Sequence, residues 1–199
     1  MSRGLAAREV ATAVARRPSG ALGASHGGQV VLVPLIAGLV VLAFATFPFD
    51  RALVAACLAG VLVLLAAIDI QRGIIPNRIV LPASGLILLG DVVLFPNRAL
   101  EWVLAGLVAA VVLAMPALLG RAWMGMGDAK LALLLGVGLG WGVFGALLVG
   151  FLCVFPVALL VLIRGGAAAR KTTIPFGPFL SLGALIVLFG PHLAGLPTS

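Results

Sequence analysis

A chain of 199 residues that is 63% hydrophobic and only 10% charged is too apolar for an ordinary soluble domain. Its apolar runs approach the ~20 residues that a helix needs to cross a bilayer, and they are too numerous to share one core. The formal net charge of +7 comes from Lys and Arg in short segments between these runs. Such a distribution is typical of membrane topology and not of nucleic-acid binding. The sequence therefore predicts an all-α, polytopic membrane protein that contacts the lipid bilayer and has no nucleic-acid partner.

Seven apolar runs are predicted to be transmembrane helices. In chain order they are 30–47, 52–70, 79–95, 101–119, 129–141, 143–163 and 179–196. The fifth is short and glycine-rich, so taken alone it is also consistent with a re-entrant segment. If all seven cross the membrane from a cytoplasmic N-terminus, every Lys and Arg except Arg51 and Arg98 falls on the cytoplasmic side. This positive-inside bias favours seven spans, with the N-terminus in the cytoplasm and the C-terminus outside.

Three regions are expected along the chain. Residues 1–28 are rich in Arg, Ala, Gly and Ser and are predicted to be a basic, disordered cytoplasmic tail. Residues 29–50 are predicted to be an extra N-terminal transmembrane helix, and 51–196 a transmembrane domain. A cleaved signal sequence is the alternative for the first region, because Arg16 and Arg17 precede an apolar run. That run is long enough to span, which favours the tail.

Metal and cofactor chemistry is not expected. Cys57 and Cys153 lie alone in apolar runs, and His26 and His192 lie near opposite ends of the chain. The sequence contains neither a CxxC pair nor an HExxH motif, so it predicts no zinc site and no disulfide framework.

Asp69 and Asp128 stand out among the six acidic residues because each falls at the cytoplasmic end of a predicted span. A charge at the bilayer centre costs about 2.5–3.5 kcal/mol, so acidic groups at membrane depth point to function. The structural alternatives are an N-cap for Asp128 and a local ion pair with Arg72 for Asp69. Asp91 falls near the outside end of its span, where solvation at the interface is expected. Two carboxylates that share a proton can activate water and protonate a carbonyl, which is the chemistry of aspartic proteolysis.

Three motifs resemble those of the type IV prepilin peptidases, the membrane aspartic peptidases with a GxGD motif. The resemblance covers about residues 51 to 196. The motifs, in order, are Asp69 followed by Ile75-Pro76-Asn77, then Gly125-Met126-Gly127-Asp128-Ala129-Lys130, and finally IPFGPFL from Ile174 to Leu180.

The resemblance implies that Asp69 and Asp128 are the catalytic pair of a multipass enzyme in the cytoplasmic membrane. The implied reaction removes the leader of a prepilin-like precursor on the cytoplasmic side, typically after glycine and just before the precursor's hydrophobic helix. The residues expected to shape the site are Pro76, Asn77, Gly125, Gly127, Lys130, Pro175, Phe176, Gly177 and Pro178.

Many members of that family carry paired CxxC motifs linked to N-methylation of the new terminus. This sequence has no CxxC motif, so N-methyltransferase activity is not expected. The chain looks more like the short, peptidase-only members, including those that serve Flp/Tad-type pili and archaeal preflagellins.

Two alternative functions fit the sequence less well. A presenilin-like GxGD protease would have a Tyr-Asp pair, but the chain has no tyrosine, and Pro116-Ala117-Leu118 comes before the GxGD motif instead of after it. A small carrier could use Asp69 and Asp128 as a proton relay. Carriers usually place such acids near the midplane between inverted repeats, whereas no repeat is evident here and both acids fall at one face.

Overall fold

The computed structural model describes residues 26–118, 126–169 and 175–193, and all structural statements below refer to these ranges. Within them the chain forms helices and no strand, which confirms the all-α prediction. In chain order the elements are α2 (His26–Thr46), α3 (Phe49–Arg72), α4 (Asn77–Leu94), η1 (Pro96–Arg98), α5 (Ala99–Leu118), α6 (Met126–Leu139), η2 (Gly140–Gly142), α7 (Val143–Ala169) and α8 (Gly177–Leu193).

Each of the seven predicted runs corresponds to one α-helix, α2 to α8. Four stretches are long and apolar enough to cross a membrane: Phe49–Arg72, Asn77–Leu94, Pro96–Met115 and Met126–Leu160. Shorter apolar stretches occur in α2 (Val31–Thr46) and α8 (Gly177–Pro191). The protein is therefore a multipass membrane protein, while the seven spans and their orientation stay predictions.

The chain divides into two compact units, with the boundary between residues 34 and 35. Of the first unit, only the first turns of α2 lie within the described ranges, and residues 1–25 of the predicted tail lie outside them. The second unit holds the remainder of α2 and all of α3 to α8. The architecture and sites below belong to this second unit.

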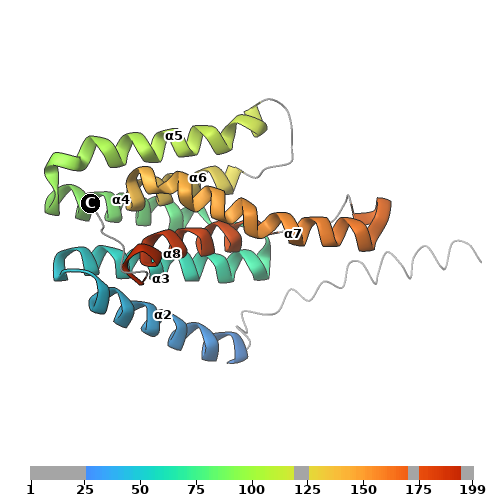
Figure 1. Ribbon diagram of the computed structural model, residues 1–199, viewed down its shortest axis with the longest axis horizontal. Coiled ribbons are helices and arrows are strands. Elements are labelled where there is room, and N and C mark those ends of the chain that lie inside the picture. The colour runs from blue at the N-terminus through green and yellow to red at the C-terminus, as the bar shows by residue number, and fades with distance from the viewer. Residues whose placement is uncertain (1–25, 119–125, 170–174, 194–199) are drawn as a thin grey trace, which may run out of the picture. The chain divides into compact units, whose positions relative to one another are not determined.

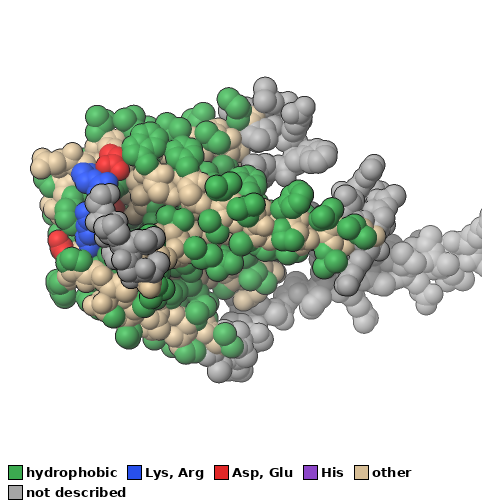
Figure 2. All heavy atoms as spheres, in the orientation of Figure 1, with side chains coloured by type: hydrophobic (Ala, Val, Ile, Leu, Met, Phe, Trp, Pro, Cys, Tyr) green, Lys and Arg blue, Asp and Glu red, His purple; other side chains and the backbone are tan. Residues whose placement is uncertain are grey.

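Helices α3 to α8 run in alternating directions (Figure 1). The C-terminus of α3 therefore lies at the same end as the N-termini of α4, α6 and α8, and we call this the Asp69 end. The N-terminus of α3 lies at the other end with the C-termini of α4, α6 and α8, and we call this the Arg51 end. In Figure 2, hydrophobic side chains cover most of the visible face, and charged side chains gather at the Arg51 end.

Helix α6 occupies the interior, packed against α4 and α5, while α8 packs against α3 and α7 (Figure 1). From Gly127 to Leu139 no residue of α6 is exposed, as expected for a helix that is apolar around its whole circumference. Helix α5 lies very close to α6. A Cβ added to Gly136 on α6 would lie only 2.6 Å from the backbone nitrogen of Gly106 on α5. Small residues at such contacts let membrane helices pack backbone to backbone.

A glycine separates α6 from α7. Gly140 has φ +58°, a left-handed conformation that costs a glycine little and most other residues considerably more. Helix α6 ends there, η2 makes a short turn, and α7 begins at Val143. The continuous apolar stretch from 126 to 160 is therefore two helices, in agreement with the two predicted runs.

The expected solvation of Asp91 at the interface is wrong. Asp91 is only 7% exposed, and its Oδ2 has no hydrogen-bond partner among the described residues. The reason is the packing of the last turns of α4, which turns this side chain toward a cavity that α3 and α6 also line.

Candidate active site

Asp69 is a buried carboxylate in the last turn of α3, with 5% of the residue exposed. The helix ends in a glycine cap. Gly73 has φ 62°, and its N–H donates to the backbone oxygen of Asp69 at 2.7 Å. This cap satisfies a carbonyl at the helix terminus and turns the chain sharply toward α4. The side chain of Asp69 is thereby fixed at the junction between two membrane helices.

The third sequence motif supplies a direct partner for that carboxylate. Gly177 begins α8, and its N–H donates to Oδ2 of Asp69 at 2.9 Å. A Cβ on residue 177 would lie 2.7 Å from the same oxygen, so only glycine permits the approach without displacement. Pro178, in the first turn of α8, needs no N–H donor at that position. The start of α8 therefore holds Oδ2 of Asp69 in place.

Phe176, the residue before Gly177, packs against a residue outside the motif. Its ring centroid lies 5.1 Å from that of Phe151 on α7. Pro175, just before it, fixes the backbone entering α8. Sequence reasoning did not identify Phe151, because an aromatic residue inside an apolar run carries no signal of its partner.

The GxGD motif contacts the segment that connects α3 and α4. A Cβ on Gly127 would lie 3.1 Å from the Cβ of Ile75, which makes this one of the tight contacts at the start of α6. Three residues on, Lys130 Nζ donates to Asn77 Oδ1 at 2.8 Å. Pro76 has an extended conformation and precedes the first residue of α4. The first and second motifs are therefore in contact.

Asp128 lies in the first turn of α6 and is partly buried. The N-cap expectation for this residue is wrong, because the helix begins at Met126 and Asp128 is its third residue. Gly125 lies outside the described residues. Since α3 ends where α6 begins, Asp69 and Asp128 lie at the same end of the helices.

The polar groups at the Asp69 end include carboxylates, an amide, an ammonium, a backbone N–H and the guanidinium groups of Arg72 and Arg78. Within the described ranges, no group of three or more His, Cys, Asp or Glu side chains could hold a metal ion. The two cysteines are free thiols on α3 and α7. This set of groups suits proton transfer between carboxylates and water.

Comparison with known proteins agrees with the motifs. The sequence profile described as the type IV leader peptidase family matches residues 56–168. This range holds Asp69 and the GxGD motif and ends before the third motif.

Relatives from two Aeromonas species carry the name prepilin leader peptidase/N-methyltransferase. One from Aeromonas salmonicida is 34% identical over 169 residues, which are 79% of this chain and 56% of the relative. One from Aeromonas hydrophila is 32% identical over 166 residues, 79% of this chain and 57% of the relative. The chain thus spans little more than half the length of these relatives, and no solved structure matches it. With the profile matching more than half of its residues, the chain belongs to the type IV leader peptidase family.

Proposed function

We propose that this protein is a membrane-embedded aspartic endopeptidase that removes the leader of prepilin-like precursors, with Asp69 and Asp128 as its catalytic pair. Family membership supports leader peptidase activity. The position of both acids at the Asp69 end supports their assignment. The buried hydrogen bond from the Gly177 N–H to Asp69 is the observation that carries the proposal, because it joins two motifs 108 residues apart at one carboxylate.

The proposed chemistry needs only these two side chains and water. The ionised carboxylate takes a proton from water as the water oxygen attacks the scissile carbonyl carbon. The protonated carboxyl donates its proton to the carbonyl oxygen, which gives a tetrahedral diol. Collapse of the diol breaks the C–N bond as the leaving nitrogen is protonated, and the pair recovers its single shared proton. Neither carboxylate forms a covalent bond to substrate.

The surrounding groups position the pair. The Gly177 N–H fixes the rotamer of Asp69 by holding one of its two oxygens. The contact between Lys130 and Asn77 ties the first turns of α6 and α4 together at the same end. Precise placement of reacting groups is worth orders of magnitude in rate, since a displacement of 1 Å can cost about 100-fold. We assign Pro76, Pro175 and Pro178 to shaping the backbone and not to substrate contact.

The family resemblance supports a proposal for the substrate and the location. We propose a prepilin-like precursor, including the Flp/Tad type, cleaved at the cytoplasmic face of the inner membrane. The methyl transfer named for the Aeromonas relatives is not assigned to this chain, because its sequence has no CxxC motif.

The proposal is tested with purified protein and pilin-like precursors, by measuring the mass of each precursor's new N-terminus. Asp69→Asn and Asp128→Asn should each lower the cleavage rate at least about a hundredfold, because each removes an acid–base group. Asp50→Asn is the matched control, since Asp50 lies in the first turn of α3 at the Arg51 end. Near-normal cleavage by either active-site variant would refute the pair. Ion or solute flux without cleavage would favour the carrier instead.

A further inference from the structure

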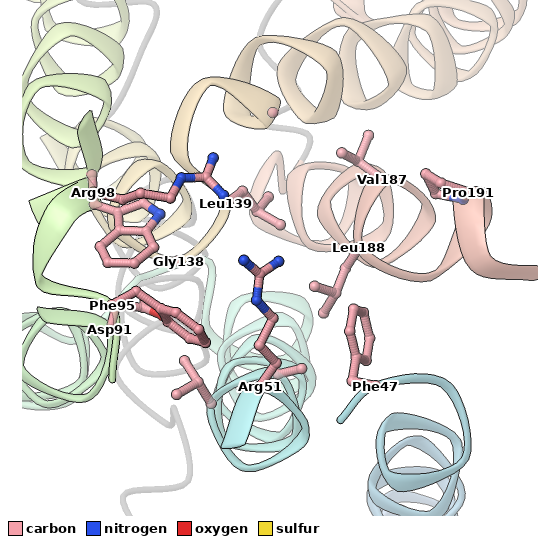
Figure 3. Close-up of a pocket in the computed structure, with 14 residues that line it drawn as sticks. Phe47, Arg51, Asp91, Phe95, Arg98, Gly138, Leu139, Val187, Leu188 and Pro191 are labelled. Carbon is pink, nitrogen blue, oxygen red and sulfur yellow. The ribbon is translucent and has the colours of Figure 1, made fainter. Parts of the chain in front are cut away.

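A second polar site lies at the Arg51 end, about a helix length from Asp69. It is a cavity of about 280 Å³, near the lower bound of ordinary small-ligand sites. Its lining comes from helices α3, α4, α5, α6 and α8 and from η1 and η2, and it includes Arg51, Asp91, Phe95, Arg98 and Trp102. Figure 3 shows the guanidinium groups of Arg51 and Arg98 directed into the same space. No step of the proposed peptidase reaction uses this cavity.

The two arginines that line the cavity differ in their partners. Arg98 is fully engaged along one edge, with Nε and Nη2 each 2.9 Å from the carboxylate of Glu101. Arg51 lies with its Cζ 4.7 Å from the centroid of the Phe95 ring, an arrangement that fixes the guanidinium by a cation–π contact. Among the described residues the ion pair of Arg98 is the sole one. The N–H donors of Arg51 therefore remain for a group inside the cavity.

Asp91 supplies the opposite charge. It is more than nine-tenths buried, and its Oδ2 accepts no hydrogen bond within the described part of the chain. A buried carboxylate oxygen without a donor is costly, so such a group normally has a partner. Arg51 lines the same cavity but makes no ion pair with Asp91. A guest that accepts from Arg51 and donates to the other oxygen of Asp91 would compensate both charges.

We propose that this cavity binds the headgroup of a phospholipid that carries both a phosphate and a primary ammonium, as phosphatidylethanolamine does. The phosphate oxygens accept hydrogen bonds from Arg51, whose planar fork suits a phosphate. The ammonium donates to Oδ1 of Asp91, the carboxylate oxygen that is not enclosed, since a primary ammonium carries three donors. A choline headgroup has no N–H to donate, and a glycerol headgroup has no cation for Asp91. The site thus selects for the ethanolamine group.

The surroundings of the cavity favour a lipid over a dissolved zwitterion. The cavity lies where apolar helices end, with Phe95 and Trp102 on its wall at 6.2 Å between ring centroids. Aromatic side chains concentrate at the headgroup level of membranes. Large apolar side chains at these same helix ends are exposed: Phe49 by 77%, Val93 by 69% and Leu100 by 70%. They provide a surface along which acyl chains can lie.

The test compares lipids on the full-length protein in detergent. Short-chain phosphatidylethanolamine, phosphatidylcholine and phosphatidylglycerol are titrated separately, with bound lipid counted by native mass spectrometry. We expect the ethanolamine lipid to bind at least about tenfold more tightly than the other two, the effect of one charged hydrogen bond in a buried site. Asp91→Asn should remove that preference, and Arg51→Gln should weaken binding of all three lipids. Asp50→Asn and Arg78→Gln are the matched controls, because neither residue lines the cavity, and both should bind as wild type does.

The lipid panel on the wild-type protein decides the proposal even if a variant fails to fold, which circular dichroism and size exclusion would reveal. Equal binding of the three lipids would overturn it. So would unchanged selectivity in a folded Asp91→Asn protein. Soluble O-phosphoethanolamine and inorganic phosphate are added as competitors. Competition by either as strong as that of the lipid would show that the cavity recognises a dissolved ion and not a membrane lipid, and would overturn the assignment to a lipid.

Discussion

Replacing Gly177 by alanine tests how tightly the candidate active site is built. The new Cβ would lie 2.7 Å from Asp69 Oδ2, 3.1 Å from its Cγ and 3.3 Å from its Cβ. Ordinary contacts of a Cβ begin at 3.4 Å, so the carboxylate or α8 must move by about 0.7 Å to relieve the closest contact. The hydrogen bond from the residue 177 N–H, worth about 1.5–3 kcal/mol to a charged acceptor, would be strained at the same time.

A shift of this size should lower the turnover number of leader cleavage by about 10- to 100-fold, since 1 Å of misplacement costs about 100-fold. The melting temperature should fall by several degrees, since the strained contact costs about 1–3 kcal/mol and each kcal/mol lowers it by about 2–4 °C, but the fold should hold because residue 177 is the first of its helix and its φ is not left-handed. Gly190→Ala on the same helix is the matched control. Its Cβ would meet only Ile186 Cγ2, at 3.9 Å, so cleavage should stay at the wild-type rate. A folded Gly177→Ala protein that cleaves within twofold of wild type would refute the role given to this contact.

Three further outcomes are expected. Gly136→Ala should destabilise the protein by about 1–3 kcal/mol, measured by reversible unfolding, because its Cβ would lie 2.6 Å from the backbone nitrogen of Gly106. Gly85→Ala, with open space around it, should be neutral, and an equal effect would contradict the packing argument. A double-mutant cycle between Lys130→Met and Asn77→Ala should give a coupling of about 0.5–1 kcal/mol, and additive effects would show that the contact contributes nothing. Leader cleavage should be unaffected by a metal chelator or by serine- and cysteine-directed inhibitors; loss on adding a chelator would count against an aspartic mechanism.

The helices were predictable because bilayer thickness and hydropathy constrain them strongly. Gly, Pro and charged residues separate the apolar runs, and each run corresponds to one helix from α2 to α8. Boundaries were less predictable. Helix α6 begins at Met126 and not at residue 129, since Gly127 and Asp128 are tolerated in a first turn whose N–H groups have no intrahelical acceptor.

The contacts at the two ends were beyond single-sequence reasoning. The motifs suggested that Asp69 and Gly177 belong to one site, but the donor to Asp69 depends on how α8 packs against α3, 108 residues away along the chain. Asp91 was the larger error. Hydropathy placed it near the end of a span, where water is the natural expectation, and its burial depends on side chains from several other helices. The sequence therefore located the acidic residues by depth and could not determine their neighbours.

Helix α6 has a consequence for how polar groups come to lie within a bilayer. Its 14 residues reach about 21 Å, whereas the hydrocarbon layer is about 30 Å thick and the 24 residues of α3 reach about 36 Å. Since α6 is enclosed by its neighbours, this hydrophobic mismatch falls inside the protein and the surrounding lipid need not thin to accommodate it. At least one terminus of α6 must then lie deeper than the headgroups, where its free backbone groups require protein or water as partners. Asp128 lies at one terminus of this short helix and the cavity at the other. On the predicted topology, the length of α6 therefore places at least one of these polar sites below the membrane surface, while α3 is long enough to cross the full layer.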